Sequence, residues 1–176
     1  MARLRKGVSY RKLERPYTRF SKYKKLNYVR SRPVCKVVRF DMGDPSKQYD
    51  YRVDLIAKST LQIRDNSIES ARQTGNRVLE LALGKSGYHL QVRMYPHHVL
   101  RENPLACGAG ADRMSTGMAH SFGKVTGIAA QVKEGKTMFT IKTNKESLPI
   151  ARKAMRRISS KLPCACSVVE KPLKTK

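Results

Sequence analysis

The chain has 176 residues, and its 37 Lys and Arg against 13 Asp and Glu give a formal net charge of +24. Hydrophobic residues make up 40% of the chain, which suffices for one core, and no run of about 18 apolar residues exists to cross a membrane. We therefore expect one intracellular domain plus a tail, with a polyanion such as nucleic acid as its partner.

The first 39 residues carry fourteen Lys and Arg against one acid, Glu14. We predict that residues 1–36 form an extended basic arm that binds RNA, because cations can hold phosphates while aromatic rings between them stack on unpaired bases. The alternative is a disordered solubilising tail, but such tails are usually poor in aromatics. The candidate residues are Arg3, Arg5, Lys6, Arg11, Lys12, Arg15, Tyr17, Arg19, Lys22, Lys24, Lys25, Arg30 and Arg32, interleaved with Tyr10, Tyr23 and Tyr28.

Two strands and a helix are predicted next. Short apolar segments predict strands over 37–41 and 51–60, separated by a turn at Asp44-Pro45. Residues 61–64 either continue the second strand or bend away from it. Asp65, Asn66 and Ser67 are candidate caps for a helix with its apolar residues at helical spacing, and Gly84 is its expected end. Gly75 lies on the apolar face of this helix, which indicates close packing against a neighbour.

The second half repeats the alternation of strands and a helix. A strand is predicted over 88–95, and strands over 124–133 and 137–143 flank Glu134-Gly135-Lys136, which predicts a hairpin. A helix over 146–161 is followed by a strand over 164–170 and a basic tail over 171–176. No acid follows Glu146 in this helix, so its outer cations are expected to contact phosphate. These cations are Arg152, Lys153, Arg156, Arg157 and Lys161.

The element order predicts an α+β fold, with two helices packed on a mostly antiparallel or mixed sheet. In this organisation the arm (1–36) precedes a single α+β domain (37–170), and a long internal loop (96–123) interrupts the domain. A loop of this length inside a compact domain is usually either functional or disordered. Its only Lys/Arg are Arg101 and Arg113, balanced by Glu102 and Asp112, and it is rich in Gly and Ala. We expect its backbone to approach a partner closely; a flexible surface loop is the alternative.

Motifs for catalysis are weak. Gly84-Lys85-Ser86 lacks the upstream Gly of a phosphate-binding loop. Cys107 with His97 or His98 resembles a nucleophile and its base, but no third group that orients the base is identifiable. The cysteines (Cys35, Cys107, Cys164 and Cys166) are expected to be reduced, with the last pair on a strand. We predict no enzyme activity, no metal and no cofactor; an RNA-processing enzyme that uses Cys107 or His97 stays an alternative.

Several motifs carry a family resemblance. The segments 95–104 (YPHHVLRENP), 110–113 (GADR), 116–118 (TGM) and 122–124 (FGK), together with 65–72 (DNSIESAR) and 17–19 (YTR), resemble the universal large-subunit ribosomal protein sixteen family, in its archaeal and eukaryotic (ten-e) branch. The resemblance extends over nearly the whole chain, and the short C-terminal segment favours the archaeal side. The sequence departs from the family pattern at Ala119-His120, where a basic residue is typical.

The resemblance implies an α+β structural constituent of the large ribosomal subunit in the cytoplasm. The implied partners are large-subunit rRNA near the peptidyl transferase centre, the 5S rRNA region, A-site and P-site tRNA, and neighbouring large-subunit ribosomal proteins. A free RNA chaperone or a ribosome-assembly or translation factor is the alternative. The resemblance places a tRNA-proximal loop at Arg101, Glu102, Asn103, Gly108, Gly110, Asp112, Arg113, Thr116, Gly117 and Met118.

Overall fold

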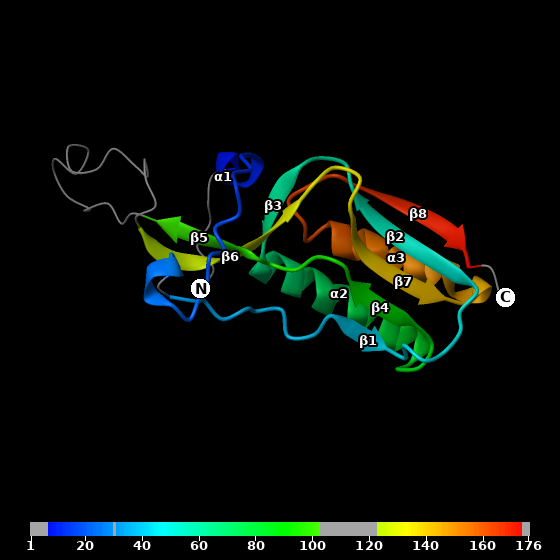
Figure 1. Cartoon of the computed structure of the whole chain (residues 1–176). Coiled ribbons are helices and arrows are strands. Elements are labelled where there is room, and N and C mark those ends of the chain that lie inside the picture. The colour runs from blue at the N-terminus through cyan, green and yellow to red at the C-terminus, as the bar shows by residue number, and fades with distance from the viewer. Residues whose placement is uncertain (1–6, 30, 103–122, 174–176) are drawn as a thin grey trace.

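The computed structural model describes residues 7–29, 31–102 and 123–173. Its strands form two antiparallel sheets (Figure 1), one of five strands in the order β1-β4-β7-β2-β8 and one of three in the order β3-β6-β5. The predicted α+β class is confirmed, although two sheets replace the single one expected. The elements are α1 (Val8–Arg11), η1 (Lys24–Leu26), β1 (Asp41–Gly43), β2 (Tyr51–Ala57), β3 (Leu61–Arg64), α2 (Asp65–Leu83), β4 (His89–Val92), β5 (His98–Glu102), β6 (Lys124–Val132), β7 (Thr137–Thr143), η3 (Lys145–Ser147), α3 (Leu148–Ser159) and β8 (Cys166–Pro172).

Helices α2 and α3 lie side by side against the five-stranded sheet (Figure 1). The apolar side chains on one face of each helix pack with the inward side chains of the strands in a single hydrophobic core, as the helical spacing predicts. The helices meet at Gly75, where a Cβ atom would stand 2.5 Å from the Ile158 side chain. The close packing predicted for Gly75 is therefore confirmed. The main buried residues are Ile68, Ala71, Leu79, Ala151, Ala154, Met155 and Ile158 on the helices and Val53, Leu55, Leu90, Phe139 and Ile141 on the strands.

The start of α2 differs from the prediction. The helix already begins at Asp65, and the preceding Arg64 makes no side-chain cap, so the assignment of Asp65, Asn66 and Ser67 as caps is wrong. The buried Asp65 carboxylate instead accepts hydrogen bonds from the backbone N–H of Asn66 (2.9 Å) and of Lys36 (3.2 Å). This second bond ties the segment before β1 to the helix. The end of α2 at Gly84 is confirmed; this glycine has a φ of 69°.

The predicted hairpin around Gly135 is wrong, because β6 and β7 belong to different sheets. β7 pairs with β2 in the larger sheet, and β6 pairs with β3 in the smaller one. Residues 58–60, between β2 and β3, and residues 133–136, between β6 and β7, are two short connections that pass from one sheet to the other. Gly135, with φ 78°, donates its N–H to the Ala57 carbonyl at 2.9 Å, so the turn is held by β2. Residues 61–64 therefore bend away from β2, which decides between the two alternatives.

Four other boundaries are corrected. The strand expected over 37–41 is the three-residue β1, and the strand expected over 88–95 shortens to β4. The first part of the predicted loop forms β5, whose partner β6 lies beyond the loop in sequence. β8 begins later than expected, at Cys166, and includes residues 171 and 172 of the predicted tail. No described helix is both long and apolar enough to span a bilayer.

Candidate nucleic-acid interface

The basic arm is docked on the three-stranded sheet through backbone hydrogen bonds. The N–H of Tyr17 donates to Nδ1 of His98 (2.9 Å), and the N–H of Val99 donates to the Tyr17 carbonyl (3.1 Å). Further along β6, the Gln131 side-chain amide donates to the Glu14 carbonyl at 3.0 Å. The arm thus occupies the free edge of β5, and Figure 1 shows it beside β5 and β6. Such coverage satisfies backbone groups that an exposed edge strand would leave open.

His98 accepts the Tyr17 N–H only while its Nδ1 carries no proton. Burial lowers the pKa of His98 below its usual value of 6.5, and the neighbouring charges of His97 and Arg101 lower the pKa further, against a smaller opposing effect of Glu14. The imidazole is therefore neutral at physiological pH, which is the state that this hydrogen bond requires. The contact couples arm docking to the protonation of His98.

The arm tyrosines are engaged by the protein itself. The Tyr17 hydroxyl donates to the Tyr28 carbonyl at 2.6 Å, and the Arg101 guanidinium lies 3.9 Å from the centre of the Tyr17 ring. The Arg19 guanidinium covers the Tyr28 ring at 4.4 Å, while the Arg19 carbonyl accepts the N–H groups of Tyr28 and Val29. Tyr17 therefore anchors the arm, whereas Tyr23, exposed on the same arm, keeps most of its surface in solvent. Base stacking by these rings stays a prediction.

A small second core fastens the arm. Val29 is 2% exposed and packs with Val99 of β5 and Ile128 of β6, while Tyr17 and Val125 lie against the same cluster. Burying a valine side chain is worth about 1.5–3 kcal/mol relative to leaving it exposed. The arm is thus held by apolar packing as well as by backbone hydrogen bonds.

The described cations of the arm are exposed to solvent. Lys12 forms an ion pair with Glu14 at 3.2 Å, but both groups are exposed, so this pair contributes little to stability. Arg32 lies over the Phe20 ring at 5.3 Å, and Lys22 lies over the Tyr23 ring at 5.2 Å. Among the candidate residues the exposed cations are Arg11, Lys12, Arg15, Arg19, Lys22, Lys24, Lys25 and Arg32; Arg3, Arg5, Lys6 and Arg30 lie outside the described residues.

The cations of α3 divide into two groups. The Arg152 guanidinium is paired with the Glu170 carboxylate of β8, with Nη2 2.8 Å from Oε2. This hydrogen bond raises the pKa of Arg152 and lowers the pKa of Glu170. The prediction that no acid accompanies the helix is wrong for Arg152, because the partner acid lies on β8, beyond the end of the helix. Lys153, Arg156 and Arg157 are exposed on the same helix.

The two ends of the long loop meet at the sheet. Glu102, the last residue of β5, pairs with Lys124, the first residue of β6, and Arg101 pairs with Val125. Arg101 and Glu102 are half-buried there. The other tRNA-proximal candidates (Asn103, Gly108, Gly110, Asp112, Arg113, Thr116, Gly117 and Met118) lie outside the described residues, as does Cys107.

The remaining polar candidates have structural contacts. Sγ of Cys164 lies 3.7 Å from Sγ of Cys166, and their contact lowers the pKa of Cys164 and raises the pKa of Cys166. His89 is buried with Nε2 3.1 Å from Asp41 Oδ1. Nδ1 of His97 lies 3.0 Å from the Tyr95 carbonyl. Among the residues that the structure describes, no three His, Cys, Asp or Glu side chains group as metal ligands would.

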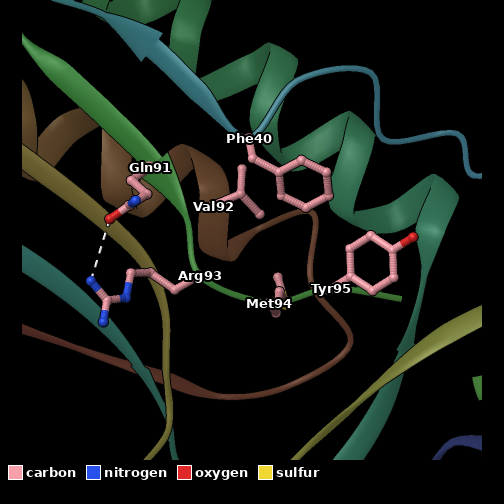
Figure 2. A pocket seen from close by; sticks show the side chains of 6 residues that line it. All are labelled: Phe40, Gln91, Val92, Arg93, Met94 and Tyr95. Carbon is pink, nitrogen blue, oxygen red and sulfur yellow. Dashed lines mark hydrogen bonds between the residues drawn. The ribbon is translucent and has the colours of Figure 1, made fainter. Parts of the chain in front are cut away.

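Sequence reasoning missed an aromatic pair on another part of the surface. Figure 2 shows Phe40, from the segment before β1, beside Tyr95, from the segment after β4. Their ring centroids are 5.7 Å apart with an interplanar angle of 30°. Tyr95 directly before Pro96 was an available signal, but the five elements from β1 to β4 separate it from Phe40 along the chain, so no local pattern reveals the pair.

A family model described as ribosomal protein L16p/L10e matches residues 15–169. The chain is 46% identical over 166 residues to the large ribosomal subunit protein uL16 of Methanococcus maripaludis, which covers 94% of this chain and 93% of the relative. It is 43% identical over 162 residues to uL16 of Staphylothermus marinus, covering 91% of this chain and 93% of the relative. For uL16 of Archaeoglobus fulgidus the identity is 41% over 160 residues, covering 91% of this chain and 88% of the relative.

Proposed function

The chain belongs to the ribosomal protein L16p/L10e family, and from that premise we propose that its basic arm and helix α3 bind large-subunit rRNA. As a member of this family it is a structural, non-enzymatic constituent of the large ribosomal subunit, with rRNA and neighbouring ribosomal proteins as its partners. Its matches to archaeal proteins agree with the archaeal side of the resemblance. Its place is then on cytoplasmic ribosomes.

The exposure of the arm cations carries the rRNA proposal. The arm uses its backbone, Tyr17 and Val29 to dock on the domain, and these contacts leave the Lys and Arg side chains in solvent. Cations held on an ordered segment lose less freedom when they meet phosphates than cations on a free chain do. Phosphate contacts of this kind orient a protein on RNA without reading its sequence.

The arm and α3 differ in how many cations they offer. Arg156, Lys153 and Arg157 extend the positive surface on α3, while Arg152 is engaged by Glu170. We assign the main rRNA contact to the arm and a supporting contact to these three residues. We propose that these contacts lie near the peptidyl transferase centre and the 5S rRNA region, as the family motifs imply.

The long loop is assigned to A-site and P-site tRNA. Two points support this assignment: the family motifs between residues 101 and 118, and the β5–β6 pairing that holds both ends of the loop at one place. The loop is formally neutral, so it does not compete with the arm for rRNA phosphates. The arm and α3 anchor the protein, and the loop approaches tRNA.

Salt dependence tests the rRNA assignment. If about eight phosphates are neutralised, log K for a large-subunit rRNA transcript falls with log salt at a slope of about −6 to −7. Replacing Lys22, Lys24 and Lys25 by Gln should make this slope shallower by about 2–3. A wild-type slope near zero contradicts electrostatic rRNA binding.

A matched triple variant tests whether position matters beyond net charge. Lys85, Lys133 and Lys136 are also exposed but lie outside the arm and α3. Their replacement by Gln removes the same charge and should change the slope by less than about 1. If both triple variants change the slope equally, general charge, and not the arm, accounts for the binding.

Separate variants test the loop. Replacing Arg113, or deleting residues 108–111, should lower the rate of translation by purified ribosomes while leaving rRNA association unchanged. Equal loss of translation and rRNA association contradicts this division of roles.

A high-salt wash tests the alternative function. A free RNA chaperone or assembly factor should be lost from large subunits in this wash, whereas a subunit constituent should stay bound.

A further inference from the structure

The aromatic pair beside the five-stranded sheet marks a second candidate RNA contact. We propose that the cavity beside Phe40 and Tyr95 binds one unpaired nucleotide of the large-subunit rRNA, with its base against the aromatic rings and its phosphate near Arg93. This inference rests on the proposed rRNA-binding function and adds a site that belongs neither to the arm nor to α3.

The geometry of the pair favours stacking. Phe40 packs against the main core, and Tyr95 is stacked on it with 51% of its surface exposed. The backbone N–H of Val92 donates to the Phe40 carbonyl at 2.8 Å, and this bond holds the two segments side by side. The exposed Tyr95 ring is thus stacked on a Phe40 ring that packs against the core. Preorganised aromatic rings are what sequence-tolerant recognition of unpaired bases uses.

The cavity has the size and polarity of a mononucleotide site. Its volume is about 380 Å³, near the lower end of the range of about 300–1,000 Å³ that is typical of small-ligand pockets. Its six lining residues include one cation and no acid: Phe40, Gln91, Val92, Arg93, Met94 and Tyr95. Among the elements of an RNA, one extruded nucleotide matches a hollow of this volume better than a double helix does.

The polar and aromatic groups lie at opposite ends of the cavity. Figure 2 shows Arg93 and Gln91 at one end and the two rings at the other. Nη1 of Arg93 donates to the Gln91 side-chain oxygen at 3.3 Å, which leaves the other guanidinium N–H groups for a phosphate. The Gln91 amide steadies the cation in this position. A nucleotide presents the same two parts, a flat base and an anionic phosphate.

An aliphatic groove between α2 and α3 provides the contrast. It is lined by cations around Val78, Leu81 and Ile150, and it contains no aromatic ring. Leu81 is 81% exposed there. Because this groove offers no aromatic ring for a base to stack on, the Phe40–Tyr95 cavity is the better base site, and Leu81 supplies an exposed apolar control.

Binding of the full chain to a large-subunit rRNA transcript tests the site. Tyr95→Ala should weaken binding by about 5- to 150-fold with an unchanged salt slope, since stacking carries no charge. Tyr95→Phe should retain wild-type affinity, and Leu81→Ala should stay within about twofold of it. Arg93→Gln should make the salt slope shallower by about 1. A Tyr95→Ala variant that binds like Leu81→Ala overturns the proposal.

A photo-crosslinking amino acid at position 95 gives a second readout in purified large subunits. The expected result is one crosslink to a single unpaired rRNA nucleotide. A crosslink to another protein, to a base-paired helix or to nothing overturns the proposal. If the wild type binds rRNA with a steep salt slope while both Tyr95 tests fail, only this site is refuted. A wild type that does not bind rRNA refutes the proposed function and this site together.

Discussion

Replacing Val29 by Ala tests how the arm is held. The Val29 side chain is 2% exposed in the small core of Val99 and Ile128, so the substitution removes two buried methyl groups. At about 0.8 kcal/mol for each buried carbon, plus a cost for the cavity left behind, arm docking should weaken by about 1.5–3 kcal/mol. The equilibrium population of molecules whose arm is detached from the sheet should then rise by about 10- to 100-fold.

Hydrogen exchange of the Val99 amide measures this opening directly, because its N–H donates to the Tyr17 carbonyl of the docked arm. Exchange of this amide should accelerate by about 10- to 100-fold, while exchange of the Ile141 amide in the five-stranded sheet stays unchanged. Val34→Ala is the matched control, since Val34 is 88% exposed. Equal exchange of the Val99 amide in the two variants would refute the account of docking by apolar packing.

Three further predictions concern pH, backbone strain and charge. Because burial lowers the pKa of His98, its contact with the arm is fully stabilising above pH 6.5 and is lost as the pH falls through the lowered pKa. Tryptic cleavage of the arm should therefore accelerate as the pH falls over that range. In the His98→Gln variant the cleavage rate should depend less on pH. Gly43 and Gly84 both have positive φ, but only at Gly43 would a Cβ meet backbone, 2.0 Å from a carbonyl oxygen. Gly84→Ala should therefore lower the free energy of unfolding, measured in urea, by about 1 kcal/mol, and Gly43→Ala should lower it by at least about 2 kcal/mol more. Equal losses would contradict the clash expected at Gly43. Glu170→Gln should release Arg152 and steepen the salt slope of rRNA binding by about 1, and an unchanged slope would show that Arg152 does not reach phosphate.

The two long helices were predictable because their information is local. Apolar residues at helical spacing and Gly84 predicted α2 to within a few residues of its bounds, and the stripe of α3 is buried as expected. Gly75 was also predictable, because a glycine on an apolar helical face has few uses other than close packing.

The sheets were less predictable because strand pairing is not local. Gly135 between two strands has the pattern of a hairpin, yet β6 and β7 pair with β3 and β2 in separate sheets. β5 is hard to predict because its partner β6 begins only after the long loop, and Val99 is its one buried residue, so its side chains do not alternate between buried and exposed. Arg152 similarly looked unpaired because Glu170 approaches it only once β8 has joined the sheet.

The sequence alone determined the charge of the arm, the two amphipathic helices, the α+β class and the family motifs, since each of these lies in composition or in short-range spacing. Only the tertiary structure decided that the arm docks on β5 through Tyr17 and Val29 and presents its cations to solvent. It also brought Phe40 and Tyr95 together from segments far apart in the chain. Such contacts depend on which distant segments pack together, and the net free energy of that packing is a property of the whole fold.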